Sequence, residues 1–174
     1  MTQSQPVRLQ IRPFAENDWP QLWAVLEPAF RAGDSYPCQP DISEQDAQLY
    51  WLTPPKRSFL AVDDTGEVCG AYYIRPDQGG LGDHICNCGY VVHPSARGRG
   101  VAGQLAAHSE AEALRSGFLG MRFNLVVATN EAGVRAWRKA GFDIVGTVPK
   151  AFRHIDHGLV DAHVMFKWLT KDQT

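Results

Sequence analysis

The apolar positions of this chain follow two different spacings, which predict strands and helices in alternation. Residues 7–12 (VRLQIR) alternate apolar and polar side chains, as expected of an opening strand that stops at Pro13. Apolar residues three and four positions apart then predict a helix that follows the cap residue Asp18 and ends at Gly33. The buried face of this helix would carry Trp19, Leu22, Trp23, Leu26 and Phe30.

The same two spacings continue to the end of the chain. Ser43 is a cap residue for a second helix that runs to about Trp51, and the turn at residues 63–66 (DDTG) predicts a hairpin. Further elements are expected as strands at residues 58–62, 67–74, 84–92, 121–127, 142–148 and 159–168, and as helices at 101–115 and 131–140. With neither repeats nor linkers, this order predicts one α/β domain, residues 7–169, with an extended mixed sheet.

Composition and charge narrow the function classes. The 174 residues include 17 basic and 19 acidic residues, whereas nucleic-acid-binding proteins usually carry a basic excess. No apolar run reaches the ~18 residues of a membrane span, and the first residues lack the apolar core of a signal peptide. The four cysteines form no CxxC pair and are expected to be reduced thiols. We therefore expect a cytoplasmic protein that binds neither nucleic acid nor membrane.

Residues 90–103 (YVVHPSARGRGVAG) combine a strand, a glycine-rich turn and the start of a helix. Glycines let the backbone approach a ligand closely, and the first helical turn offers unpaired N–H groups at the positive end of the helix dipole. With Arg97 and Arg99 beside it, such a turn favours a pyrophosphate, although an ordinary strand-to-helix turn is the alternative. The segment lacks the GxxxxGK[ST] pattern of P-loop proteins and the βαβ context of a dinucleotide site.

This segment resembles motif A of the GCN5-related N-acetyltransferase (GNAT) family, [Q/R]xxGx[G/A], with Arg97, Gly100 and Ala102 at the defined positions. Residues 130–142 (NEAGVRAWRKAGF) resemble motif B of the same family, and the order of elements fits over nearly the whole chain. The resemblance implies a central, mostly antiparallel mixed sheet flanked by helices, whose splayed central strands receive the pantetheine arm. It also implies an N-acetyltransferase that uses acetyl-CoA as co-substrate.

The resemblance further implies which residues bind acetyl-CoA. The backbone of Tyr90, Val91 and Val92 would line the pantetheine arm. The pyrophosphate would lie at the turn and the first helical residues, Arg97, Gly98, Arg99, Gly100, Val101, Ala102 and Gly103. Asn130 would bond to a pantetheine amide, and Trp137 would lie near the sulfur.

A narrower resemblance concerns the acceptor. The chain resembles the yeast proline-analogue N-acetyltransferases and their bacterial relatives at residues 33–36 (GDSY), 84–89 (HICNCG), 123–126 (FNLV) and 160–162 (VDA). In that branch an asparagine on the strand before motif A holds the acceptor's carboxylate, and Asn87 occupies the matching position. Tyr36 follows a loop that borders the acceptor pocket in the family, so it is a candidate acceptor contact or a plain packing residue. The acceptor implied is an amino acid or a similar small amine.

Transfer of an acetyl group from a thioester needs a neutral amine and hydrogen-bond donors for the oxyanion. Unpaired backbone N–H groups at Val91 or Val92 are the candidate donors. Some relatives carry a glutamate near the position of Cys86 that is absent here, so His84, the nearest titratable residue, is the candidate base; a strand histidine without catalytic role is the alternative. His154 and His157 fall in the expected loop before the last strand, where a surface role is the simpler interpretation.

The CoA thiolate that leaves either takes a proton from an acid or departs unprotonated. Many relatives carry a tyrosine at the position of Trp137, and an indole cannot supply that proton. Tyr90 is the candidate acid, and Tyr72 and Tyr73 are alternatives that the residues alone do not separate.

A metal site is not expected. His84, Cys86 and Cys88 alternate along one strand, so their side chains are separated by ~6.5–7 Å along the strand direction. One metal ion with Zn–S bonds of ~2.3 Å would not bridge that spacing.

Three function hypotheses remain open at this point. The first is acetylation of a small amine, and the second is acetylation of protein N-termini or lysines, which would need an open acceptor groove. The third is an acyl-CoA-binding sensor without turnover. A homodimer is a further expectation, because dimers are common in the family.

Overall fold

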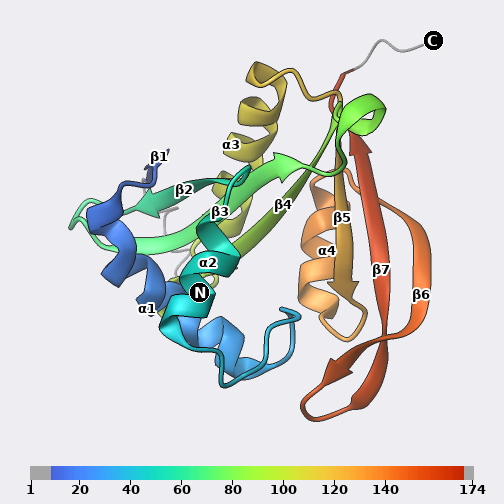
Figure 1. Ribbon diagram of the computed structural model, residues 1–174, viewed down its shortest axis with the longest axis horizontal. Coiled ribbons are helices and arrows are strands. Elements are labelled where there is room, and N and C mark those ends of the chain that lie inside the picture. Colours follow the sequence, from blue (N-terminus) through green and yellow to red (C-terminus); the bar gives the residue numbers. More distant parts are fainter. Residues whose placement is uncertain (1–8, 171–174) are drawn as a thin grey trace, which may run out of the picture.

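The computed structural model describes residues 9–170, in which seven strands form one mixed sheet with helices on both faces (Figure 1). The strands lie in the order β1-β2-β3-β4-β5-β7-β6, and every neighbouring pair is antiparallel except β4 and β5. They are β1 Gln10–Pro13, β2 Arg57–Val62, β3 Val68–Pro76, β4 Ile85–Val92, β5 Gly120–Val127, β6 Asp143–His154 and β7 Gly158–Trp168. The helices are α1 Trp19–Ala32, α2 Glu44–Leu52, α3 Val101–Arg115 and α4 Glu131–Lys139.

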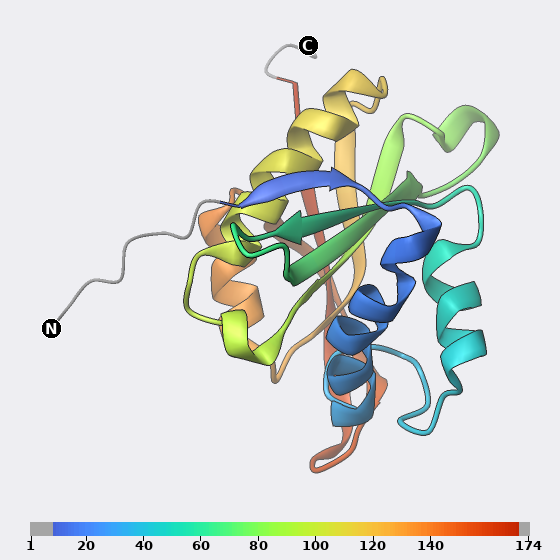
Figure 2. The same ribbon diagram turned by 90° about the vertical axis from the view of Figure 1, so that its left-hand side faces the viewer.

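Helices lie on both faces of the sheet (Figure 2), and one apolar cluster on each face holds them. On one face Leu22 and Phe30 of α1 pack with Leu60 of β2, and α2 joins the same cluster. On the other face α3 and α4 pack against the sheet, with Leu105 and Met121 fully buried. The sheet is therefore the middle of three layers. Within residues 9–170 no helix is long and apolar enough to cross a membrane.

The predicted fold class is confirmed, and most elements lie where the spacing of apolar residues placed them. α3 has the predicted bounds, and α1 ends at Gly33, which adopts the left-handed conformation (φ 62°). The Ser43 hydroxyl accepts the Asp46 N–H at 3.1 Å and so begins α2. Residues 7 and 8 of the predicted first strand lie outside the described residues.

β6 differs from its prediction, because it continues to His154 instead of ending at Val148. Its pairing with β7 contains a register shift between Val148 and Phe152. Within that shift Lys150 has a positive φ (54°), and its N–H bonds to the Asp161 carboxylate at 2.9 Å. The bulge carries the chain past Pro149, which lacks an N–H, and the alternation of apolar and polar residues is lost there.

The parallel pair β4 and β5 is joined by only three residue pairs, residues 85–87 opposite residues 120–122. Beyond them the two strands diverge (Figure 1), as the family resemblance implied. Aromatic rings fill the α4 side of the opening, with centroids of neighbouring rings 4.4–5.9 Å apart: Tyr90, Phe123, Trp137 and Phe142. Phe123 and Phe142 are buried, and the rings of Tyr90 and Trp137 are partly buried against them.

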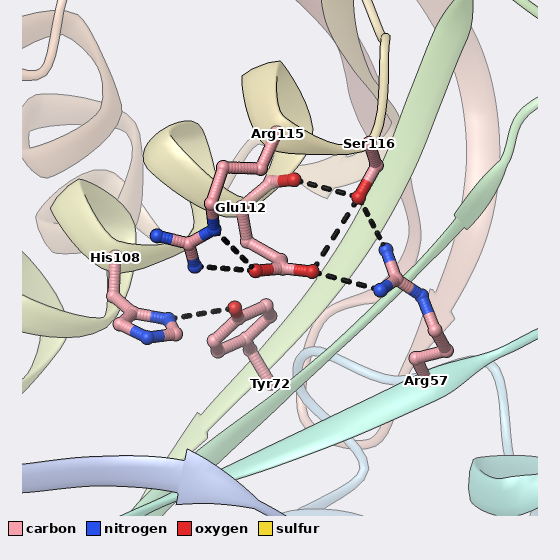
Figure 3. Close-up of polar contacts among 6 residues, drawn as sticks. All are labelled: Arg57, Tyr72, His108, Glu112, Arg115 and Ser116. Carbon is pink, nitrogen blue, oxygen red and sulfur yellow. Dashed lines mark hydrogen bonds and ion pairs between the residues drawn. The ribbon is translucent and has the colours of Figure 1, made fainter.

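A polar cluster ties the C-terminal half of α3 to β2 (Figure 3). The Glu112 side chain, 11% exposed, accepts hydrogen bonds from Arg57 at 2.8 Å and from the Arg115 Nε at 3.1 Å. Burial raises the pKa of Glu112, but hydrogen bonds from Arg115 and Arg57 outweigh burial and hold this pKa below its usual value. Glu112 therefore stays ionised and fixes α3 on the sheet.

We expect Glu112→Gln to lower the free energy of unfolding by about 2 kcal/mol at pH 7, because two arginines lose their carboxylate. The loss stays below that of a fully buried pair, since the Arg57 and Arg115 side chains are 51% and 61% exposed and are screened by solvent. A lowered folded-state pKa means that the Glu112 contribution is present above the unfolded value of about 4.3 and is lost as the pH falls through the folded value.

Urea unfolding at pH 7 and at pH 3 measures this loss. Glu131→Gln is the matched control, because it breaks an exposed pair with Arg135 and should cost less than about 0.5 kcal/mol. A loss for Glu112→Gln that is equally large at both pH values would contradict the expectation.

Candidate active site

A cleft of about 450 Å³ lies where β4 and β5 diverge. One end of it, here called the small-residue end, is lined from α3 and α4 by Ala102, Gly103, Ala106, Gly133 and Ala136. The other, the polar end, is lined from β3, β4, β5, α2 and the loop after α1 by Tyr36, Tyr50, Tyr73, Arg75, Asn87 and Asn124. Because its lining comes from both faces of the sheet, the cleft passes through the opening between the strands.

The N-terminus of α3 forms part of the small-residue end. Gly100 precedes the helix in the left-handed conformation (φ 80°), and no side chain caps the first turn. The first N–H groups of α3 therefore have no partner within the helix. A Cβ at Gly103 would meet no atom within 4 Å, so the backbone there is open to a ligand. Together with the helix dipole, this arrangement suits a phosphate group.

Half of the residues predicted to bind the cofactor line the cleft, namely Tyr90, Val92, Ala102, Gly103, Asn130 and Trp137. The turn residues Arg97, Gly98, Arg99 and Gly100 do not line it but lead directly into the uncapped end of α3. Val91 and Val101 point their side chains into the two cores, 4% and 2% exposed. The Asn130 Oδ1 accepts the Gly133 N–H at 3.0 Å, which leaves the side-chain NH₂ group for a ligand.

The register of β4 decides which of its backbone groups are unpaired. His93 donates to Cys69 at 2.9 Å, and Asp77 donates to Ile85 at 2.8 Å, so both ends of the β3–β4 ladder are hydrogen-bonded pairs. Hydrogen-bonded and non-hydrogen-bonded pairs alternate along the ladder between these two ends, so Val91 is in a hydrogen-bonded pair and its N–H bonds to β3. The N–H groups of Tyr90 and Val92 instead face the opening toward β5. Of the two expected oxyanion donors, Val92 is thus available and Val91 is not.

Tyr36 brings the loop after α1 against β4. Its hydroxyl donates to the Tyr90 carbonyl at 2.5 Å, and its ring packs on Phe30 with centroids 5.2 Å apart. The same loop is tied to the β6–β7 hairpin, because the Ile155 N–H bonds to the Gly33 carbonyl at 3.2 Å. The loop therefore forms part of the wall at the polar end of the cleft.

Two residues of β3, Tyr73 and Arg75, line the polar end, although the sequence did not indicate either as an acceptor contact. Arg75 lies opposite Asn87 in the β3–β4 ladder, so both side chains are on the same face of the sheet. Tyr73 covers Gly89, where a Cβ would lie 2.5 Å from the Tyr73 ring. The signal in the sequence was an arginine, Arg75, directly after the mostly apolar residues 67–74 that were predicted as a strand.

The ionisable side chains that line the cleft keep one charge state around neutral pH. Burial is the largest influence on the four tyrosines Tyr36, Tyr50, Tyr73 and Tyr90, and it raises the pKa of each above its usual value. Burial also raises the pKa of the Cys88 thiol well above its usual value. Among the described residues that line the cleft there is no carboxylate and no histidine.

The structure does not bring His84 to the cleft. The side chain is exposed in the turn just before β4, and its ring stacks on Trp168 with centroids 6.5 Å apart. The prediction that His154 lies in a loop is wrong, because this residue ends β6. It is buried there and its Nδ1 accepts the Asp156 N–H at 3.0 Å. His157 lies beside it in the turn, exposed, with ring centroids 4.5 Å apart. None of these three histidines lines the cleft.

The hydroxyl groups of the candidate acids differ in their surroundings. Tyr90 lines the cleft with its ring, but its hydroxyl is bonded to the Ser109 hydroxyl of α3 at 2.7 Å. Tyr72 is fully buried against α3, and its hydroxyl is bonded to the His108 Nδ1 at 2.9 Å (Figure 3). Tyr73 lines the polar end. The geometry therefore offers no support for proton donation by Tyr90 or Tyr72.

A second cavity, of about 1020 Å³, lies between α2, β2 and α3, and Glu112 is among its lining residues. It is larger than the cleft but shares no lining residue with it and none with the glycine-rich turn. Within residues 9–170 no group of three or more His, Cys, Asp and Glu side chains could hold a metal ion. The cleft is thus the site where the predicted motifs meet.

Comparison with known proteins places the chain among acetyltransferases. The model of the acetyltransferase (GNAT) family matches residues 19–142. The N-acetyltransferase aca1 of Schizosaccharomyces pombe is 38% identical over 111 residues, 63% of this chain, and the match spans about half, 53%, of that protein's length. A GCN5-related N-acetyltransferase from Kribbella flavida has a TM-score of 0.86 at 37% identity, covering 92% of this chain and 97% of that one. A phosphinothricin acetyltransferase from Sinorhizobium meliloti, in complex with acetyl-CoA, shares the fold, with a TM-score of 0.83 at 18% identity over 95% and 90% of the two chains.

Proposed function

The chain belongs to the acetyltransferase (GNAT) family, and we propose that it transfers the acetyl group of acetyl-CoA to the amine of a small acceptor. The observation that carries this proposal is the cleft through the sheet, with an uncapped helix N-terminus at one end and a covered polar end at the other. Acetyl-CoA and the acceptor would enter from opposite faces and meet beside Tyr90 and Val92.

The residues at the small-residue end fit the donor. The first N–H groups of α3 and the charges of Arg97 and Arg99 would hold the pyrophosphate, and neither arginine forms an ion pair within residues 9–170. The Asn130 NH₂ group would bond to the pantetheine arm. Acetyl-CoA supplies a thioester, which an amine attacks directly.

At the reaction centre the chain supplies donors and positioning. The N–C bond forms while the C–S bond breaks, CoA leaves as its thiolate, and the amine loses a proton to water. The Val92 N–H, which faces the opening, would donate to the oxygen of the carbonyl group as negative charge develops there. Position and electrostatics account for catalysis in this scheme, because the cleft wall offers no general base.

A small acceptor is favoured over a protein. The Tyr36 loop and its contact with the β6–β7 hairpin cover the polar end, whereas a protein acceptor needs an open groove. The amide of Asn87, 6% exposed, lies at the same end, as expected for a residue that orients an amino acid.

The experiment that tests this proposal follows free thiol release from acetyl-CoA with amino acids, proline analogues, polyamines and short peptides as acceptors. We expect turnover with one class of small amines and none with peptides. Acetyl-CoA binding without thiol release for any amine would contradict catalysis, and turnover with peptides alone would contradict the small acceptor.

Within this assay, Asn87→Ala should raise the KM of a carboxylate-bearing acceptor about tenfold, because one hydrogen bond of about 1.4 kcal/mol is lost. Asn87 also donates to the Arg122 carbonyl at 2.9 Å, so acetyl-CoA affinity and thermal unfolding must be measured beside it. Asn17→Ala, an exposed site before α1, is the matched control and should leave the KM unchanged. An unchanged KM for Asn87→Ala would remove this residue from the acceptor site.

A further inference from the structure

Arg75 is a cation without a partner. It is the only charged side chain on the wall of the cleft, it is half-buried, and it forms no hydrogen bond or ion pair within residues 9–170. The nearest acidic residue along the strand, Asp77, is occupied, because it pairs with Arg122 and accepts the Asn124 amide at 2.9 Å. A half-buried charge that nothing in the protein neutralises is costly unless a ligand or water meets it.

A second cation lies behind the aromatic wall of the polar end. The Lys56 Nζ is 4.4 Å from the ring centroid of Tyr50 and 4.8 Å from that of Tyr73. Burial lowers the pKa of Lys56, and repulsion from Arg75 lowers it further. The two cations are therefore close enough to repel each other. An anion placed at Arg75 would relieve this repulsion.

A neutral donor completes the surroundings of Arg75. Asn87 lies directly across the β3–β4 ladder on the same face and uses only one N–H in its bond to the Arg122 carbonyl. A guanidinium next to a primary amide can offer two or three N–H donors to one planar anion, and a carboxylate matches this geometry. A cationic group of a ligand would be repelled by Arg75, and a neutral amide group would leave the charge of Arg75 unpaired.

We infer that Arg75 binds the carboxylate of the acceptor, with Asn87 beside it, so that the enzyme selects amino or imino acids that carry a free carboxylate. This inference rests on the proposed function, because it assumes that the polar end receives the acceptor. The carboxylate anchors the acceptor at β3 and β4, and the amine then faces the opening where Val92 lies. Polyamines and amino acid amides are rejected because they carry no charge complementary to Arg75.

The first test compares each amino acid that is turned over with its carboxamide. We expect Arg75→Gln to raise the KM for the acid about 100-fold, because a charge-assisted, two-point hydrogen bond is lost. The KM for the amide should change less than threefold. Arg75→Lys should restore part of the affinity for the acid, since it keeps the charge but not the fork geometry. Arg135→Gln on the exposed face of α4 removes the same charge elsewhere and serves as the control.

A binding measurement separates this inference from the proposed function. The CoA-loaded protein is titrated calorimetrically with the L-amino acids and with their carboxamides, with and without Arg75→Gln. The inference is supported if the acids bind more tightly than the amides to the wild type but not to Arg75→Gln. This result would support the inference even if the activity assay shows no thiol release, and in that case only the proposed function fails. Amides that bind or react as well as acids, or equal losses for both in Arg75→Gln, overturn the inference while acetyl transfer to amines stands.

Discussion

The value of kcat/KM for acetyl transfer should rise about tenfold per pH unit below the pKa of the acceptor amine and should level off above that pKa. Only the neutral amine attacks, and the side chains that line the cleft do not change charge between about pH 6 and 9. Burial raises the pKa of the lining tyrosines and of Cys88, so these groups remain protonated. A raised pKa keeps a neutral acid neutral, so none of them can act as the base.

The measurement uses two acceptors whose amines differ in pKa. For an amine with a pKa near 10.4 the rise from pH 6 to 9 should be roughly 1000-fold, whereas for an α-amino group with a pKa near 8 the curve should level off at about pH 8. A plateau at the same pH for both acceptors would contradict the prediction, because it would report a group of the protein. Lys56 is the candidate for such a group, because burial lowers its pKa and its Nζ is 4.8 Å from the ring centroid of Tyr73, and Lys56→Met would test it.

The variant Gly103→Leu should bind acetyl-CoA on the order of 100-fold more weakly than the wild type while folding normally. Neither backbone conformation nor packing requires a glycine here: Gly103 lies within α3, does not have a positive φ, and would have no atom within 4 Å of an added Cβ. Glycine inside a helix costs about 1 kcal/mol relative to alanine, so its presence needs another reason. The reason we propose is close approach of the donor to the first turn of α3.

The two effects of Gly103→Leu should therefore have opposite signs. Stability in urea should stay equal or rise, because leucine favours a helix, whereas calorimetry should show the loss of affinity for acetyl-CoA. Ala107→Leu, one turn later on the exposed surface of α3 and outside the cleft, is the control and should bind within twofold of the wild type. Normal affinity in Gly103→Leu would place the donor elsewhere.

Local patterns were sufficient for most of the fold and for one end of the site. The helices at residues 19–32 and 101–115 followed from their apolar spacing and from glycine or cap residues at their ends, which are properties of neighbouring residues. Ala102 and Gly103 at the start of α3, and Asn130 before α4, could be placed at the cleft for the same reason, since a short segment contains each motif.

The rest of the site depends on contacts between distant segments. Whether the Val91 or the Val92 N–H is unpaired depends on the register between β3 and β4, which alternation within β4 does not reveal. Arg75 joins Asn87 only because their strands pair, and the sequence separates the two by eleven residues between them. His84 is the opposite case. It is close to motif A in the sequence, but it lies before the far end of the strand and does not line the cleft.

The short junction between β4 and β5 also divides the molecule along the chain. β1 to β4 and β5 to β7 are each continuous in sequence, and the ladder between them has only three residue pairs. A donor molecule lying in the opening would meet N–H groups of β4 that a neighbouring strand would otherwise take. Such a ligand would complete the interrupted sheet. The affinity for the donor and the stability of the contact between the two halves would therefore be thermodynamically linked.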